Sequence, residues 1–220
     1  MDKVFIQDTA MHPNPSWEKV VGKYGKLVSM NKDFDENVKL VVFTGGADVN
    51  PTLYGQEIGR LTRYNDVRDQ IDLARYYIAK EMGIPMLGIC RGAQFLCVMN
   101  GGSLVQHCSG HLNSNHVVYL DNGVSFLTNG DHHQMMIPDG STHRVLAYAN
   151  GLSLVYRGAG SKKYDKSIFY KNITGQCKEP EAVLWPEQKA LGIQWHPEWS
   201  HDPKARAIMQ VQDWVEEYLL

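Results

Sequence analysis

The fold is decided by residues 84–102, which read IPMLGICRGAQFLCVMNGG. The apolar run 85–89 is typical of a short strand that is buried on both faces. A GxCxG element, formed by Gly88, Cys90 and Gly92, comes next, and apolar residues at helical spacing then run to the stop signal at 100–102. A strand that turns sharply into a helix is the building unit of α/β proteins. We therefore predict a parallel sheet with helices on both faces.

The flanking sequence extends this pattern. Strands are predicted at 4–6, 26–30 and 39–44, and helical spacing predicts a helix over 67–82, with Asn65 or Asp66 as its N-cap. Asp202 as cap and Pro203 at the first helical position predict a final helix. The second half favours an antiparallel addition to the sheet, with short strands at 117–120, 144–148, 152–156, 167–170 and 182–184 and an exposed loop at 162–166. No linker or repeat is visible, so we predict one domain over residues 1–220.

Composition excludes several classes of protein. The 220 residues are 43% hydrophobic and 21% charged, which argues against disorder, and no apolar run approaches a membrane span. The net charge of −2 gives no basic surplus for binding nucleic acid. The four cysteines form no short-spaced framework and the N-terminus does not resemble a signal peptide. We expect a cytoplasmic protein with reduced thiols.

The GxCxG element predicts a nucleophile. In hydrolases the equivalent GxSxG holds a serine on a strained turn between strand and helix, clear of the sheet. A cysteine there also gains from the helix N-terminus, which favours the thiolate, and from the free N–H groups of the first helical turn. The competing interpretation of the pentapeptide alone is a small buried cysteine beside packing glycines.

Two further segments supply what a thiolate nucleophile needs. His196 and Glu198 lie two residues apart after the apolar run 190–195, so both side chains can face one site as base and orienting group. The glycine turn at 45–46 follows the predicted strand 39–44 and can present a backbone N–H to an oxyanion. We choose Gly46 as that donor, with the N–H of Arg91 as the second.

These segments together resemble a known family. The strings TGGADVNP (44–51), GIPMLGICRGAQFLCVMNGGSLVQH (83–107), HHQ (132–134) and GIQWHPEW (192–199) are similar to those of the class I (triad) glutamine amidotransferase superfamily. Within it they most resemble the γ-glutamyl hydrolase branch (peptidase C26), which includes γ-glutamyl-γ-aminobutyrate hydrolase. The similarity runs from about residue 38 to 201, and the first 37 residues resemble nothing that we can assign.

The resemblance implies a flavodoxin-like α/β fold and a Cys, His, Glu triad that uses no metal and no cofactor. Residue by residue, it implies Cys90 as nucleophile, His196 as base and acid, and Glu198 as orienting group. It also implies contacts to the glutamyl group from Gln94 in the GxCxGxQ pattern, and from His133 and Gln134 in the HHQ string. The segment 129–134, which reads NGDHHQ, departs from the branch, because a serine is expected before the histidines, and this leaves recognition of the amino-acid end open.

Several alternatives remain at this point. The preferred function is hydrolysis of a γ-glutamyl amide to glutamate and an amine. The alternative is a glutaminase subunit that supplies ammonia to a synthetase, and since no synthetase domain follows Leu220 we expect that partner to be a second chain. A non-catalytic binding protein and a cysteine protease are weaker interpretations, and a homodimer is possible. A zinc site is a further hypothesis for His107, Cys108, His111 and His116, but their spacing matches no recognised ligand pattern, so we favour a polar loop near the cleft.

Overall fold

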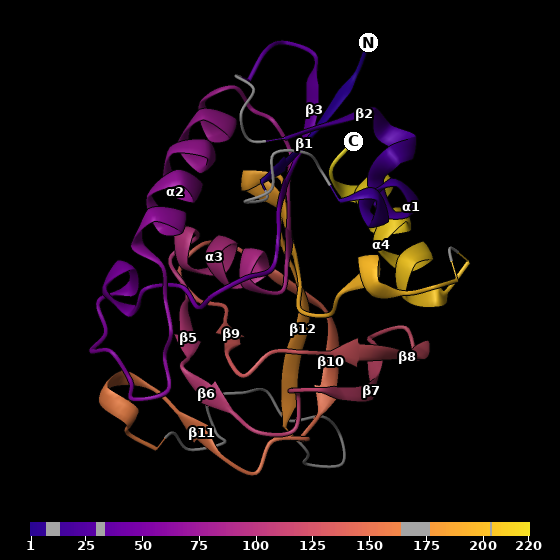
Figure 1. Ribbon diagram of the computed structural model, residues 1–220. Coiled ribbons are helices and arrows are strands. Elements are labelled where there is room, and N and C mark those ends of the chain that lie inside the picture. Colours follow the sequence, from indigo (N-terminus) through magenta and orange to yellow (C-terminus); the bar gives the residue numbers. More distant parts are fainter. Residues whose placement is uncertain (8–13, 30–33, 164–176, 203) are drawn as a thin grey trace.

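The structure is a computed structural model that describes residues 1–7, 14–29, 34–163, 177–202 and 204–220. In this part of the chain the main sheet has nine strands, in the order β2-β1-β3-β4-β13-β12-β10-β7-β8 (Figure 1). The strands from β2 to β13 pair in parallel: β2 (Lys26–Ser29), β1 (Lys3–Gln7), β3 (Val38–Phe43), β4 (Met86–Ile89) and β13 (Ala190–Ile193). This is the strand order of a flavodoxin-like sheet.

The rest of the main sheet is antiparallel. It contains β12 (Lys178–Trp185), β10 (Arg144–Asn150), β7 (Ser114–Leu120) and β8 (Ser125–Gly130). Two small sheets cover one end of it: β6 (His107–Cys108) pairs with β11 (Tyr156–Arg157), and β5 (Ser103–Val105) pairs with β9 (Met135–Ile137). The predicted parallel sheet with an antiparallel addition is confirmed.

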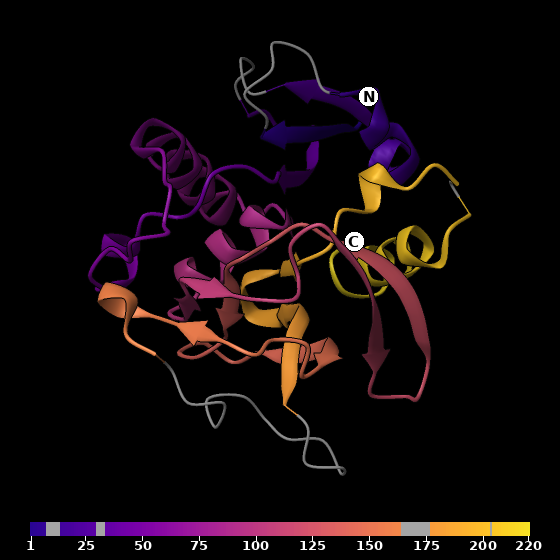
Figure 2. The same cartoon turned by 60° about the horizontal axis from the view of Figure 1, so that its bottom comes forward.

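Helices cover both faces of the parallel strands. One face carries α2 (Asp66–Glu81) and α3 (Arg91–Met99), and the other carries α1 (Glu18–Val21) and α4 (Arg206–Tyr218) (Figures 1 and 2). Successive side chains along each strand point to opposite faces of the sheet and so contribute to two hydrophobic cores. Val42 packs on the side of α1 and α4, whereas its neighbours Val41 and Phe43 pack on the side of α2 and α3. A strand buried on both faces must be apolar at successive positions, which is why 40–43 is a continuous apolar run.

Most predicted element positions agree with the structure, and three do not. The predicted helix at 67–82 is α2, capped by the side chain of Asn65, which accepts from the N–H of Arg68. The last helix begins at Arg206 with Ala205 as its N-cap, so Asp202 is not that cap; its side chain instead accepts from the N–H of Lys204 in the preceding turn.

The other differences lie in the second half. Of the predicted strand 152–156 only Tyr156 belongs to a strand, β11, and residues 152–155 do not. The N–H groups of Leu152 and Ser153 bond to the Glu179 carboxylate instead of a neighbouring strand. Cys108 is not in a loop but buried in β6. The predicted strand 167–170, Pro203 and residues 164–166 of the predicted loop lie outside the described residues. None of the helices in the described part of the chain has the length and apolar character needed to cross a membrane.

Candidate active site

The carboxyl ends of three neighbouring strands meet at one edge of the sheet. Gly45 and Gly46 follow β3, Cys90 follows β4, and His196 lies three residues after β13. Because β3, β4 and β13 are adjacent and parallel, these residues converge although 106 positions separate Cys90 from His196. Ligands of open α/β sheets bind at this edge.

Cys90 sits on a sharp turn between β4 and α3. Its backbone has φ 52° and ψ −109°, which is rare for a residue with a side chain. The turn depends on close backbone approach: a Cβ on Gly92 would lie 2.0 Å from the Phe43 carbonyl oxygen, and one on Gly88 would lie 2.4 Å from the Gly92 oxygen. Only glycine fits at either position, so the GxCxG spacing fixes the elbow.

His196 and Glu198 form a buried pair beside Cys90. Nδ1 of His196 lies 2.7 Å from Oε1 of Glu198. Burial disfavours the imidazolium, but hydrogen bonds to the Cys90 sulfur and the Glu198 carboxylate outweigh it and raise the pKa of His196 to about 10. The ring also passes close to Gly45, where an added Cβ would lie 2.8 Å from Cε1.

Asn129 fixes the backbone of the histidine. Its Oδ1 accepts from the N–H of His196 at 2.8 Å, and its Nδ2 donates to the His196 carbonyl at 2.9 Å. Asn129 belongs to β8, at the far edge of the sheet, so this two-point clamp ties the antiparallel half of the fold to the site. The sequence analysis did not single out Asn129, because an amide that clamps a remote backbone leaves no local pattern.

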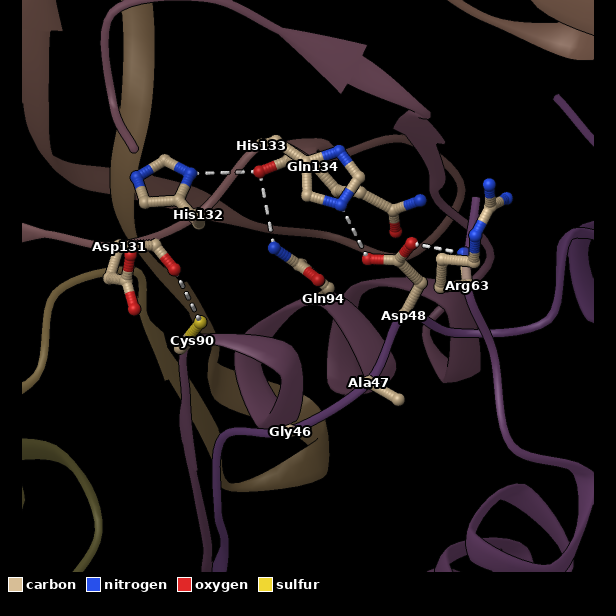
Figure 3. Close-up of a pocket in the computed structure, with 10 residues that line it drawn as sticks. All are labelled: Gly46, Ala47, Asp48, Arg63, Cys90, Gln94, Asp131, His132, His133 and Gln134. Carbon is tan, nitrogen blue, oxygen red and sulfur yellow. Dashed lines mark hydrogen bonds and ion pairs between the residues drawn. The ribbon is translucent and has the colours of Figure 1, made fainter. Parts of the chain in front are cut away.

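A cavity of about 220 Å³ opens in front of the Cys90 sulfur. One wall comes from the loop after β3, the floor from the start of α3, and the opposite wall from the segment after β8 (Figure 3). The lining residues are Gly46, Ala47, Asp48, Arg63, Cys90, Gln94, Asp131, His132, His133 and Gln134. A cavity of this size accommodates a small molecule.

The predicted binding residues Gln94, His133 and Gln134 all line this cavity. Gln94 Nε2 donates to the Gln134 carbonyl at 3.1 Å. Nε2 of His133 lies 3.1 Å from Oδ1 of Asp48, and Oδ2 of the same carboxylate accepts from the Arg63 backbone N–H at 2.7 Å. The side-chain amide of Gln134 donates to the Gln106 carbonyl at 3.4 Å, whereas the backbone carbonyl of Gln134 accepts from Gln94.

A buried charge network holds the two predicted oxyanion donors. The guanidinium of Arg91 pairs with both Asp69 and Asp72, and Nε of Arg68 lies 2.9 Å from Asp72. Arg68 also donates to the Thr44 carbonyl at 3.1 Å, next to the Gly45-Gly46 turn. The network therefore connects the start of α3 to the loop after β3. Gly46 itself has φ 148°, a conformation that favours glycine.

Cys90 differs in surroundings from two other buried cysteines. Burial raises the pKa of the Cys97 and Cys108 thiols, which keeps both protonated and unreactive at neutral pH. Neither Cys97 nor Cys108 lines the cavity. Cys90 alone among these three has the imidazole of His196 as a neighbour.

Four residues of the cavity wall were missed as candidates from sequence: Asp48, Arg63, Asp131 and His132. Asp48 and the segment 131–132 lie within or beside strings that carried the resemblance, so position in a motif was an available signal. Arg63 lies in an irregular segment before α2 without any such signal. The predicted polar loop at His107, Cys108, His111 and His116 is wrong for its buried members, since Cys108, His111 and His116 all lie in the interior.

Comparison with known proteins identifies the family. The model of the family described as Peptidase C26 matches residues 26–198. The chain belongs to the peptidase C26 family. A glutamine amidotransferase-like protein, YvdE, of Lactococcus lactis is 30% identical over 215 residues, which cover 84% of this chain and 80% of that protein. The match places this peptidase C26 member among the glutamine amidotransferase-type hydrolases.

Two further comparisons bear on the peptidase C26 chain. A glutamine-hydrolysing GMP synthase subunit from Methanoculleus marisnigri is 27% identical over 135 residues, covering 61% of this chain and 63% of that protein. The crystal structure of a glutamine amidotransferase from Thermotoga maritima superposes with a TM-score of 0.56 at 16% identity, covering 98% of this chain and 84% of that one. The similarity to the Thermotoga maritima structure confirms the predicted flavodoxin-like α/β fold.

Proposed function

We propose that this chain hydrolyses a γ-glutamyl amide to glutamate and an amine through a thioester on Cys90. The observation that carries the proposal is the strained Cys90 elbow, which lines a small cavity and has the 2.7 Å His196–Glu198 pair as its neighbour. Catalysis by an activated thiolate requires a nucleophile, a base and a group that orients the base, and these three residues supply the set.

In the first half-reaction the Cys90 thiolate attacks the γ-carbonyl carbon. The oxyanion that forms accepts hydrogen bonds from the N–H groups of Gly46 and Arg91. His196, held by Glu198, then gives its proton to the leaving nitrogen. The C–N bond breaks, the amine departs, and a γ-glutamyl thioester on Cys90 remains.

In the second half-reaction water replaces the amine. His196, now neutral, accepts a proton from the water molecule that attacks the thioester carbonyl. The C–S bond breaks, glutamate leaves, and the thiolate–imidazolium pair is restored. A raised His196 pKa suits this cycle, because the imidazole must hold a proton at neutral pH until the leaving group needs it. The chemistry proposed requires neither a metal nor a cofactor.

The glutamyl group occupies the cavity between α3 and the segment after β8. Gln94 lies one helical turn from Cys90 and points into the cavity, and we assign to it, His133 and Gln134 the contacts to the amino-acid end (Figure 3). Asp131 also lines the cavity.

The test is glutamate release from a panel of γ-glutamyl compounds, glutamine included, with Cys90→Ala as control. We expect turnover of a non-glutamine γ-glutamyl amide that is lost in the variant. Full activity in Cys90→Ala would overturn the mechanism, and no turnover of any γ-glutamyl amide other than glutamine would overturn the hydrolase assignment.

The second candidate is a glutaminase subunit that passes ammonia to a synthetase on another chain. The observation that favours it is the 27% identity to the GMP synthase subunit from Methanoculleus marisnigri. The two candidates share Cys90 and differ in the leaving group and in the need for a partner. Hydrolysis of glutamine alone, at a rate that rises on addition of a synthetase, would favour this second candidate.

A further inference from the structure

Behind the cavity wall lies a buried cluster of histidines and glutamates that the proposed chemistry does not use. It is made of Glu179 and Glu181 from β12 together with His111, His116 and His132. All five residues are buried, and both glutamates are fully excluded from solvent. Buried carboxylates are costly unless they are paired with cations and hydrogen-bond donors, so the cluster needs a compensating charge.

His111 supplies that charge by bridging the two glutamates. Its Nε2 lies 3.1 Å from Glu179 Oε2, and its Nδ1 lies 3.1 Å from Glu181 Oε1. A carboxylate oxygen only accepts, so two carboxylates this close to the two ring nitrogens favour the imidazolium, which carries a proton on each nitrogen. Burial opposes the charged form, but the bonds to both glutamates outweigh it and raise the pKa of His111 to about 9. Glu179 is held further by the N–H groups of Leu152 and Ser153.

His132 connects this cluster to the cavity. Its ring packs on that of His111, with centroids 4.6 Å apart, and its backbone N–H donates to the His111 carbonyl at 3.3 Å. On the cavity side, Nδ1 of His132 lies 2.8 Å from the Gln134 carbonyl, the same oxygen that accepts from Gln94 (Figure 3).

The turn that contains His132 also reaches the nucleophile. The carbonyl oxygen of Asp131 lies 4.0 Å from the Cys90 sulfur, and Asp131, His132, His133 and Gln134 form one wall of the cavity. A shift of this turn therefore displaces the Gln134 carbonyl, which accepts from Gln94, and alters the wall that faces a bound molecule. Small displacements of binding groups are enough to lower the rate of an enzyme strongly.

We propose that the Glu179–His111–Glu181 cluster, acting through His132, holds the turn 131–134 in place for the glutamyl group. Glu181 and His132 are then positioning residues. The proposal rests on the proposed function, because it assigns the turn to binding of the glutamyl group. It predicts that substitutions at Glu181 or His132 weaken binding of the glutamyl group but leave the reactivity of the Cys90 thiolate unchanged.

A metal ion is the competing occupant of the cluster. Ligand atoms of His111, His132 and Glu181 all lie within 4.8 Å of one another. A histidine nitrogen binds a metal through its lone pair, and a protonated Nδ1 has none to offer. The two carboxylates that flank His111 thus favour an ion cluster over a metal centre, and zinc titration belongs in the test.

The experiment compares two reagents that alkylate Cys90. Iodoacetamide requires only the thiolate, whereas the glutamine-like diazoketone 6-diazo-5-oxo-L-norleucine must first bind as a glutamyl group. For Glu181→Gln and His132→Phe we expect the second-order rate with the diazoketone to fall about tenfold to a hundredfold, and the iodoacetamide rate to change less than about twofold. His132→Asn keeps a donor near the place of Nδ1, so we expect it to recover most of the loss.

His143→Phe is the matched control, because Nδ1 of His143 also faces a backbone carbonyl two residues away, that of Ser141 at 3.1 Å, but outside the cavity. We expect both of its rates to equal those of the wild type. Equal diazoketone rates in wild type, Glu181→Gln and His132→Phe would overturn the inference while leaving the proposed function standing. A wild-type chain that iodoacetamide modifies and the diazoketone does not would overturn the proposed function itself. Stoichiometric Zn²⁺ binding that is lost in Glu181→Gln would overturn the ion-cluster assignment.

Discussion

The imidazole of His196 lies flat on the indole of Trp199, with ring centroids 3.7 Å apart and 2° between the planes. Trp199 ends the short 3-10 helix Pro197–Trp199, and the same turn carries Glu198. One turn of chain thus places a carboxylate at the edge of the imidazole and an aromatic ring on its face. Both contacts favour the imidazolium and restrict the rotation of the ring.

Removing this stack is expected to lower activity without unfolding the protein. Stacking of a cation on an aromatic ring contributes about 0.5 to 2 kcal/mol, so Trp199→Leu should lower kcat/KM on a γ-glutamyl substrate by about 2-fold to 30-fold. Since the Trp199 side chain is 49% exposed, we expect little change in Tm. Trp199→Phe keeps an aromatic ring and should retain most of the activity. Equal activity in the Leu and Phe variants would contradict a role for the stack.

The strained backbone at Cys90 predicts an unusual effect on stability. With φ at 52°, the residue carries a strain of about 1 to 3 kcal/mol that glycine avoids. We expect Cys90→Gly to unfold in urea with a free energy about 1 kcal/mol higher than Cys90→Ala, although both variants are inactive. A Gly variant that is no more stable than the Ala variant would show that the turn is relaxed.

The short distance between Gly45 and His196 predicts that a single methyl group disables the site. In Gly45→Ala the new Cβ would lie 2.8 Å from Cε1 of His196, and the ring must move away from Cys90. We expect kcat/KM to fall about a hundredfold. Gly22→Ala is the control, because its new methyl group meets only the flexible carboxylate end of Glu18, and its activity should equal that of the wild type.

The two protonated histidines predict that stability falls with alkaline pH. The pKa of His111 is raised to about 9 and that of His196 to about 10, above the value of about 6.5 in an unfolded chain. A histidine whose pKa is raised on folding contributes its full stabilisation below about pH 6.5. That stabilisation is lost as the pH rises through the pKa that the histidine has in the folded protein. We expect the free energy of unfolding to decrease from about pH 7 to about pH 10. In His111→Gln the decrease should be shallower, and a parallel pH profile would contradict a protonated His111.

The charge network around Arg91 predicts a large cost for neutralising one carboxylate. Asp72 is fully buried and pairs with both Arg68 and Arg91. Asp72→Asn leaves positive charge buried without its partner, which typically costs about 3 to 5 kcal/mol of unfolding free energy. Asp213→Asn removes a surface carboxylate that lies 3.8 Å from Arg206, and we expect a change below about 1 kcal/mol. Similar losses in the two variants would show that the network at Asp72 is solvated.

Local sequence patterns were sufficient for the elements that position Cys90. The strand before Cys90, the helix after it and the cap at Asn65 each depend on residues close together in the chain. The patterns failed where partners are remote. Residues 152–156 have the composition of a strand, yet the N–H groups at its start bond to the Glu179 carboxylate, which is far along the chain. β8 (Ser125–Gly130) was not predicted, because its alternating polar residues resemble a loop.

The sequence by itself determined the class of fold, the elbow at Cys90 and the pairing of His196 with Glu198, because each rests on periodicity or on neighbours within a few residues. Only the tertiary structure decided which groups share a site. The sheet places β13 beside β4, which brings His196 to Cys90. The segment between β6 and β7 lies against β12, which places His111 3.1 Å from both Glu179 and Glu181. Protonation of His111 follows from that arrangement, because a buried imidazole takes its charge from whatever the fold packs against it.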